Sequence, residues 1–168
     1  MVRRATEGDV STLLALIRGI AEYERLAHEV EATEALLREH GFGCRPVFEA
    51  LMTERPGPRA VGFALYFFTF STFKTRPTLY LEDLFVVPEE RGSGIGRRLL
   101  VELARIAVAR GCGRMEWSVL DWNTPARKFY FKLGAVAMDE WTVFRMTPDA
   151  FGRLAHEGLT GEPPGEVI

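Results

Sequence analysis

One segment, residues 79–111, constrains the fold more than any other part of the chain. It begins with a largely apolar segment over residues 79–87, interrupted by Glu82 and Asp83, which ends at Pro88 and which we expect to form a buried strand. A glycine-rich loop follows, Arg91-Gly92-Ser93-Gly94-Ile95-Gly96. The next residues repeat apolar side chains at helical spacing as far as Gly111, namely Ile95, Leu99, Leu100, Leu103 and Ile106. A strand, a short loop and an amphipathic helix in this order predict a sheet with helices packed on it.

The loop has the composition of an anion-binding cradle. Glycines at 92, 94 and 96 let successive backbone N–H groups turn toward one point, where the helix dipole also favours negative charge. Its spacing excludes two familiar phosphate loops. The dinucleotide pattern G-x-G-x-x-G needs its third glycine one residue later, and the Lys-Ser/Thr pair of a P-loop is missing. Taken alone, the loop predicts either a phosphate site or a glycine-rich turn without a ligand.

The rest of the chain supplies strands and helices in a mixed order. Apolar periodicity and cap residues predict helices over residues 6–24, 33–40, 124–134 and 148–156. Alternating or aromatic-rich runs predict strands over residues 2–5, 47–52, 60–70, 114–120, 135–138 and 141–146, the last two as a closing pair. This order implies a mixed sheet with helices on its faces. We expect a single domain over residues 1–157 and a disordered tail over 158–168.

Composition excludes several classes of partner and cofactor. The net charge is −2 and the pI is about 6.0, whereas binding to nucleic acid needs a basic excess. The longest apolar run, residues 61–68, is too short to span a bilayer, so we expect a cytoplasmic protein that binds no membrane. The two cysteines and three histidines match no metal-ligand spacing, and we expect no metal.

Several separated motifs then resemble one family. The segment from Leu81 to Gly96 is similar to the R/Q-x-x-G-x-G/A hallmark of GNAT N-acetyltransferases. Within that superfamily the chain resembles the diamine (spermidine/spermine) acetyltransferases, and their thialysine acetyltransferase branch most. The motifs that carry this resemblance are Tyr80-Leu81-Glu82-Asp83, Asp121-Trp122-Asn123, Phe129-Tyr130 with Leu133-Gly134-Ala135, Phe70-Ser71-Thr72-Phe73-Lys74, and Val119-Leu120-Asp121-Trp122-Asn123. The resemblance extends from residue 2 to about residue 145. It implies an α/β (α+β) GNAT fold, with a mixed central sheet of six to seven strands flanked by about four helices.

The resemblance also implies where acetyl-CoA, the co-substrate, binds. The family holds it by the backbone of the central strand, by the glycine loop and by the start of a later helix. The matching residues are Leu84, Phe85, Val86, Arg91, Gly92, Ser93, Gly94, Ile95, Gly96, Arg97, Asn123, Thr124, Pro125 and Ala126. Tyr130 matches the tyrosine that lies near the thioester sulfur. Leu133 replaces a basic residue that contacts CoA in some relatives, so that contact is in doubt here.

By the same resemblance, an amine pocket is expected beside this site. Its matching residues are Tyr23, Glu24, Ser71, Glu82, Glu116, Trp117, Ser118 and Glu140. Two of the positions depart from the spermidine/spermine pattern. Ser71 stands where those enzymes have an acidic residue, and Phe73 replaces a tryptophan. The missing carboxylate favours an amino-acid-like amine over spermine.

The expected chemistry begins with removal of a proton from the amine. An amine with a pKa of about 10 is protonated at neutral pH, and only its neutral form attacks a thioester. Glu82, in a predicted central strand, is our candidate base, directly or through water; the alternative is a carboxylate in an edge strand or a structural ion pair. Regular alternation would put Glu82 and Asp83 on opposite faces of that strand. Glu24, Glu82 and Glu140 together would form an acidic funnel, although Glu24 and Glu140 singly are typical of solvated surface charges.

The later steps need an acid and an oxyanion site. Tyr130 has the right chemistry to protonate the leaving thiolate, while its alternative role is a core residue of an amphipathic helix. The backbone N–H groups near Phe85 or Val86 would meet the carbonyl oxygen as it becomes negative.

We therefore predict direct transfer of acetyl from acetyl-CoA to a primary amine of a small molecule, a thialysine- or lysine-like amine or a diamine/polyamine. Two alternatives remain at this point. One is acetylation of a protein or peptide, and the other is a non-catalytic regulatory module that binds acetyl-CoA. The resemblance further implies a homodimer.

Overall fold

The computed structural model describes residues 1–57 and 59–157. These residues belong to two compact units, Met1–Asn123 and Thr124–Ile168. Each unit is described below by itself, and the single domain expected over residues 1–157 stays a prediction. The tail predicted over residues 158–168 lies outside the described residues.

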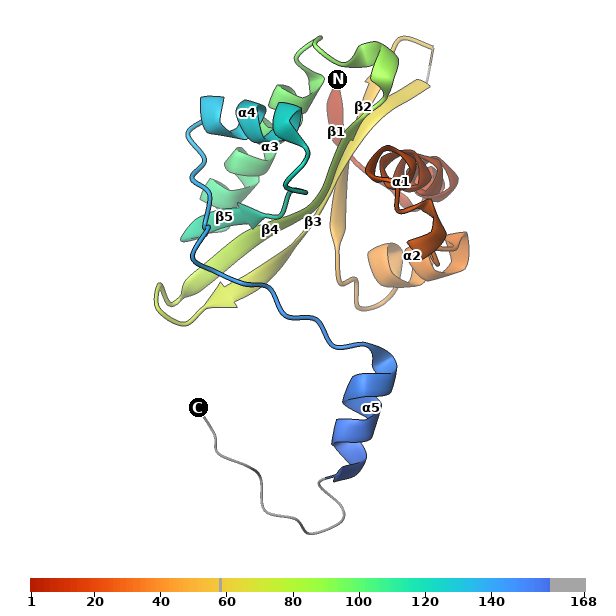
Figure 1. Ribbon diagram of the computed structural model, residues 1–168. Helices are drawn as coiled ribbons and strands as arrows, with labels where there is room; N and C mark the ends of the chain where they lie inside the picture. Colours follow the sequence, from red (N-terminus) through yellow and green to blue (C-terminus); the bar gives the residue numbers. More distant parts are fainter. Residues whose placement is uncertain (58, 158–168) are drawn as a thin grey trace. The chain divides into compact units, whose positions relative to one another are not determined.

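The first unit is built on a five-stranded sheet with the spatial order β1-β2-β3-β4-β5 (Figure 1). Neighbouring strands are antiparallel except β4 and β5, which are parallel. The strands are β1 (Val2–Arg4), β2 (Glu49–Arg55), β3 (Arg59–Ser71), β4 (Arg76–Val86) and β5 (Arg114–Trp117). The parallel pair arises because helix α3 (Ile95–Ala109) connects β4 to β5, as a parallel crossover requires.

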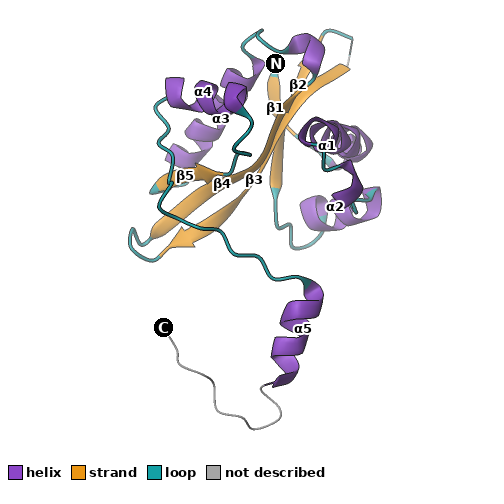
Figure 2. Ribbon diagram, viewed as in Figure 1, coloured by secondary structure: helices purple, strands orange, loops and turns teal. Residues whose placement is uncertain are grey.

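Helices cover both faces of this sheet (Figure 2). Helices α1 (Val10–Glu24) and α2 (Glu34–Phe42) lie on one face, and α3 lies on the other. The short 3-10 turns are η1 (Glu7–Asp9), η2 (Ala27–Glu29) and η3 (Pro88–Glu90). The apolar stripe predicted for α3 is confirmed, since all five of its predicted side chains are buried.

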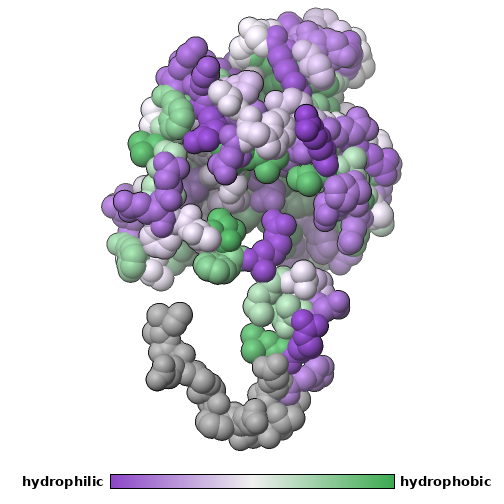
Figure 3. All heavy atoms as spheres, viewed as in Figure 1, coloured by the Kyte–Doolittle hydropathy of each residue, from purple (hydrophilic) through white to green (hydrophobic). Residues whose placement is uncertain are grey.

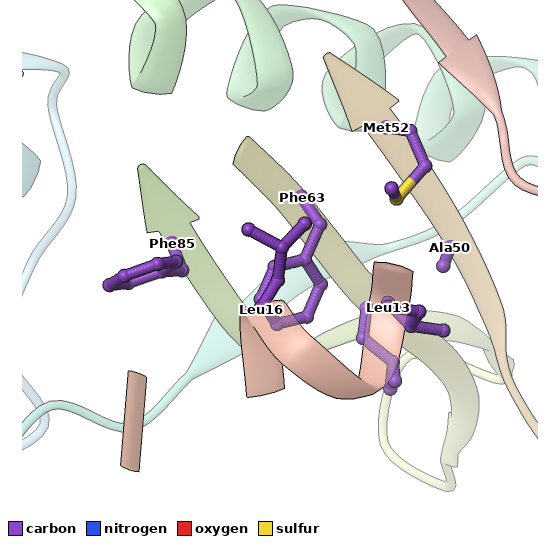
Figure 4. Packing of buried hydrophobic residues seen from close by; sticks show 7 residues of the cluster. Leu13, Leu16, Ala50, Met52, Phe63 and Phe85 are labelled. Atoms are coloured by element: carbon purple, nitrogen blue, oxygen red, sulfur yellow. The ribbon is translucent and has the colours of Figure 1, made fainter. Parts of the chain in front are cut away.

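The core beneath α1 fixes that helix against the central strands. Figure 4 shows Leu13 and Leu16 of α1 over the side chains of the sheet. Their buried partners are Ala50, Met52, Phe63, Leu65 and Phe85. Because Phe85 lies in β4, this packing holds α1 next to the central strand.

Local signals explain where the helices of this face begin. The Thr6 side chain and the Asp9 carboxylate form a capping box before α1, and the Arg3 guanidinium binds the same carboxylate at 2.7 Å. Thr33 precedes α2, and its hydroxyl oxygen accepts a hydrogen bond from the Leu36 N–H at 3.2 Å. The helix predicted over residues 33–40 is thus confirmed, with an end two residues later than predicted.

The second unit contains helices α4 (Thr124–Lys132) and α5 (Pro148–Glu157). The predicted closing strands over residues 135–138 and 141–146 are wrong, because these described residues form no strand. Val143 and Phe144 are 83% and 91% exposed although they are neighbours, so neither face of the segment is covered. An alternating apolar pattern makes a strand only where a partner strand is present. In Figure 3 helix α5 presents one hydrophobic and one hydrophilic side.

The sheet among the described residues therefore has five strands, and the prediction of six to seven is wrong. Five α-helices accompany it, against about four predicted. The strand predicted over residues 114–120 ends at Trp117, where its pairing with β4 stops, and a turn follows in which the Asn123 N–H reaches the Leu120 carbonyl at 2.8 Å. The mixed α/β architecture itself is confirmed.

Candidate active site

A β-bulge in β4 is the feature around which the site is organised. Asp83 lies opposite Leu65 of β3, whereas Leu81 lies opposite Tyr66, so Glu82 is an extra residue with no partner. Leu65 packs in the core beneath α1, and this puts Asp83 on that face. The extra residue interrupts the two-residue period of the strand, so Leu81 and Asp83 lie on opposite faces although they are two residues apart.

The same point marks the separation of β4 from β5. Their parallel pairing joins Thr78–Leu81 to Arg114–Trp117 and then stops. From Glu82 to Val86, no strand of the described chain lies along that edge of β4. The edge therefore offers backbone N–H and C=O groups to an extended ligand, in the manner of an added strand. Leu84, Phe85 and Val86, the residues expected to hold acetyl-CoA, lie along it.

The glycine loop leads from this edge into α3 with the backbone that an anion cradle needs. Gly92 and Gly94 have φ angles of 77° and 80°. A Cβ at either position would meet nothing within 4 Å, so the backbone conformation, and not a lack of space, requires glycine. The N–H groups of Ile95, Gly96 and Arg97 form the first turn of α3, where no carbonyl of the helix accepts from them. The Ser93 hydroxyl donates to the Glu90 carbonyl at 2.6 Å and steadies the loop.

A groove continues from this loop along α3. It has a volume of about 590 Å³, and its lining includes Gly94, Arg97, Arg98 and Arg105. Arg105 is paired with Glu102 at 2.9 Å. The positive lining next to the loop suits an anionic ligand.

Arg91 connects the loop to the end of α1. Its guanidinium carbon lies 4.4 Å from the ring centroid of Tyr23 and 5.7 Å from that of Phe85, and its Nε donates to the Val86 carbonyl at 3.1 Å. Each cation–π contact at such an exposed position is worth about 0.5–1 kcal/mol. The resemblance gave Arg91 a role toward acetyl-CoA only, and its contact with the predicted amine pocket had no signal in the sequence.

Tyr23 extends this connection to the chain after β5. Its hydroxyl donates to Oδ1 of Asn123 at 3.2 Å, and its ring centroid lies 5.9 Å from that of Trp122. Asn123 is buried. The structure thus brings the end of α1, the glycine loop and the segment after β5 together, as the predicted site requires.

Three carboxylates gather beside these contacts. Burial raises the pKa of the Glu24 carboxyl. Burial, and then the charges of Glu82 and Glu24, raise the pKa of Asp83 to about 7. Among the described residues, Asp83 has neither a hydrogen bond nor an ion pair through its side chain. The charges of Glu82 and Glu24 thus both act on Asp83, a residue that the sequence reasoning did not assign to the site, and the acidic funnel expected of Glu24, Glu82 and Glu140 stays a prediction.

The other predicted pocket residues of this unit lie at the ends of strands. Ser71 is the last residue of β3 and is buried, with its hydroxyl oxygen accepting from the Lys74 N–H at 3.3 Å. Glu116 pairs with Arg114 at 2.9 Å. Trp117 ends β5, and Ser118 follows it with its hydroxyl 3.1 Å from that of Tyr80. Glu116 and Ser71 thus already have partners, and no contact between either of them and the three carboxylates is found.

The remaining predicted residues belong to the second unit. Thr124, Pro125, Ala126 and Tyr130 lie on α4, which begins at Thr124. Tyr130 is half-buried, and its ring centroid lies 5.3 Å from that of Phe129. Glu140 is exposed in the segment between α4 and α5. Their roles toward the first unit stay predictions.

Residues 1–57 and 59–157 contain no group of three or more side chains arranged to hold a metal ion. None of the helices in that part of the chain is long and apolar enough to cross a membrane.

The comparison with protein families agrees with this geometry. The family model described as "Acetyltransferase (GNAT) family" matches residues 15–135. The chain belongs to this family. Its members use acetyl-CoA as the acetyl donor, and the fold and enzyme class predicted from the motifs are confirmed.

Individual relatives show which enzymes of this family the chain resembles. The chain is 42% identical to a thialysine N-epsilon-acetyltransferase of Bos taurus, over 92% of this chain and 96% of the relative. It is 31% identical to an L-ornithine N5-acetyltransferase of Arabidopsis thaliana, over 89% and 85%. Among solved structures, an integron cassette protein from the mobile metagenome of V. cholerae superposes with a TM-score of 0.77 at 26% identity, over 92% of this chain and 96% of that one. The predicted likeness to the diamine and thialysine acetyltransferases is confirmed.

Proposed function

We propose that this GNAT enzyme moves the acetyl group of acetyl-CoA directly to a primary amine of a small molecule that resembles lysine, thialysine or a short diamine. The observation that carries the proposal is the group of Glu24, Glu82 and Asp83 beside the free edge of β4. Three carboxylates attract an ammonium group, and the edge holds the acetyl donor next to it. The names of the relatives support the choice of amine.

Two parts of the site suit the acetyl donor, acetyl-CoA. The pantetheine arm carries amide groups, which suit the unpaired backbone of Leu84, Phe85 and Val86. Its pyrophosphate suits the positive-φ glycines and the first turn of α3. Backbone N–H groups near Phe85 or Val86 stabilise the carbonyl oxygen as it becomes negative.

Two side chains transfer protons in the proposed reaction, one as acceptor and one as donor. Glu82, which is exposed beside the edge, accepts a proton from the ammonium group directly or through water. Tyr130 gives a proton to the leaving sulfur, because a phenol with an ordinary pKa of about 10 is protonated at neutral pH. No covalent bond between the acetyl group and the enzyme is needed.

The pocket residues favour an amino-acid-like amine. Ser71 replaces a carboxylate of the polyamine enzymes and is buried, so it offers no charge to a distant ammonium group of spermine. Phe73, in place of a tryptophan, is 92% exposed. A long polycation therefore gains little from this end of β3.

Thiol release with a panel of amines tests the proposal. The panel contains thialysine, lysine, ornithine, a diamine, spermine and a peptide with a free N-terminus. We expect the highest kcat/KM with the amino-acid-like amines. Activity on the peptide alone would replace this function with protein acetylation.

A Tyr130→Phe variant separates an enzyme from a non-catalytic module. We expect normal binding of CoA and a kcat reduced by roughly 10²-fold or more, because only the proton donor is lost. Normal turnover by the variant would remove the role of Tyr130. Binding of acetyl-CoA by a wild-type protein that acetylates none of the amines would favour a regulatory module.

We also propose a homodimer in the cytoplasm. Exposed apolar side chains between α4 and α5, including Val143 and Phe144, support an interface with a second copy. The described chain leaves the outer edge of β5 without a partner strand, which supports the same idea. Light scattering at micromolar concentration that gave the mass of a monomer would contradict it.

A further inference from the structure

Asp83 has a position that the proposed reaction does not yet use. The bulge at Glu82 turns Asp83 toward the face that α1 covers, opposite Leu65 and two residues before Phe85. It is half-buried there, while the neighbouring Glu82 is exposed. The two adjacent carboxylates therefore stand at different depths of one site.

The groups that surround Asp83 supply negative charge. The charge of Glu82, on the same strand, and the charge of Glu24, at the end of α1, both raise the pKa of Asp83. Leu65, opposite on β3, is apolar. The positive charge that is nearest along the loop, Arg91, lies over Tyr23 and Phe85 and bonds to the Val86 carbonyl. Within the described chain, no donor or cation binds the Asp83 carboxyl.

A half-buried carboxylate without a donor is costly unless it takes up a proton. When two carboxylates lie close together, they titrate as a pair, and a single proton belongs to both. Structural ion pairs, in contrast, lower the carboxyl pKa, as Arg3 does for Asp9 in the same unit. The surroundings of Asp83 are those of a proton acceptor.

We propose that Asp83 forms a carboxylate dyad with Glu82, and that this dyad holds the proton removed from the substrate ammonium group. The inference rests on the proposed function and names a second residue for its first step. Glu82 contacts the ammonium group at the surface of the site, and Asp83 keeps the proton away from the amine while the acetyl group is transferred.

The protons and electron pairs balance in this scheme. One N–H bond of the ammonium group breaks, and one O–H bond forms on the dyad. The freed nitrogen lone pair forms the C–N bond, and the C–S bond breaks with its electrons on sulfur. Sulfur takes a proton from Tyr130, and the second N–H proton of the amine replaces the proton that Tyr130 lost. The dyad releases its proton to water before the next cycle.

The pH dependence of kcat/KM with the best amine of the panel tests the dyad. Wild type should lose activity as the pH falls through about 7, where the dyad becomes protonated. Asp83→Asn should lower kcat by roughly 10²-fold at pH 8 with the KM for acetyl-CoA unchanged, and should move the acidic limb to lower pH. Asp83→Glu keeps a carboxyl group and should restore part of the activity. Glu89→Gln, an exposed change seven residues from the bulge along the chain, is the matched control and should leave the profile unchanged.

A second measurement does not depend on turnover. In wild-type protein labelled with 13C at aspartate carboxyls, the signal that disappears in Asp83→Asn should titrate near pH 7. Glu82→Gln should move that titration to lower pH, because one negative charge is removed.

Three outcomes would contradict the inference in different ways. An acidic limb that stays in place in Asp83→Asn, or an Asp83 signal that ignores Glu82→Gln, would overturn the dyad and leave acetyl transfer intact. A larger effect of Asp83→Asn on the KM for acetyl-CoA than on kcat would show a structural role only. A wild-type protein that acetylates no amine would overturn the proposed function itself, and this role with it.

Discussion

Replacement of Asp83 by asparagine should make the folded protein more stable at alkaline pH. The raised pKa means that the folded protein binds a proton more tightly than the unfolded chain, in which an aspartate has a pKa of about 3.9. The contribution of this group to stability is therefore fully present below about pH 4, falls as the pH rises, and is lost above about 7. Asparagine has no charge to bury, so its variant does not lose stability in this way.

The size of this change in stability depends on the difference between the pKa values of Asp83 in the unfolded and folded states. Each pH unit between the two pKa values changes the free energy of unfolding by about 1.4 kcal/mol. From pH 5 to pH 7 this gives about 3 kcal/mol, and the partial exposure of the side chain reduces it to about 2 kcal/mol. Above about pH 7 the difference stops growing.

Urea denaturation of both proteins at pH 5 and pH 8 measures this difference. We expect Asp83→Asn to gain about 2 kcal/mol relative to wild type between the two pH values. Asp149→Asn, at an exposed position in the first turn of α5, is a control that should show little change. Equal pH dependence in wild type and Asp83→Asn would refute the reasoning, because it would mean that Asp83 has the same pKa in both states.

Four further substitutions test stability in other parts of the chain. Gly94→Ala should cost about 1–2 kcal/mol in thermal unfolding and weaken the binding of CoA, because its φ of 80° strains any residue with a Cβ. Gly152→Ala in α5 should instead stabilise the protein by roughly 0.5–1 kcal/mol, because a Cβ there meets nothing within 4 Å. Equal effects at the two glycines would contradict the view that the backbone conformation of Gly94 causes its loss of stability. Thr33→Ala should cost about 1 kcal/mol in urea denaturation through loss of the cap of α2, and Thr33→Ser should not. Asp9→Asn should cost about 2 kcal/mol at pH 6, since Arg3 lowers the pKa of this carboxyl; the contribution shrinks as the pH falls below about 4, so a difference of the same size at pH 2.5 and at pH 6 would contradict it.

The sequence predicted the elements whose signals are local. The apolar stripe of α3, the glycines of its loop and the cap at Thr33 each depend on residues within a few positions of one another, and all three are present. The same holds for the strands of the central hairpin, which are bounded by turn residues. Such local signals can be recognised in the sequence because the residues that interact lie close together along the chain.

The predictions that failed depended on partners far along the chain. Residues 141–146 alternate as a strand should, but a strand is stable only against another strand, and none pairs with them here. The regular alternation expected along β4 is interrupted at Glu82, because the register is set between β3 and β4. Two adjacent acids in an otherwise apolar strand were the one available signal of unusual geometry. The contact of Arg91 with Tyr23 joins residues that lie 68 positions apart, and composition gave no indication of it.

The bulge at Glu82 divides β4 into two halves with opposite phase. Before it, Leu79 and Leu81 are buried next to Phe68 and Tyr66; after it, Asp83 and Phe85 lie opposite Leu65 and Phe63. Deletion of this one residue would leave Leu81 opposite Tyr66 and Asp83 opposite Leu65, now as neighbours in a regular strand, so every core side chain would keep its face. The deletion would remove the carboxylate beside Asp83 and the irregularity of the strand at that point. A strand β4 that is one residue shorter is therefore compatible with the core but removes the proposed dyad, whereas a change of residue type at Glu82 leaves the bulge in place.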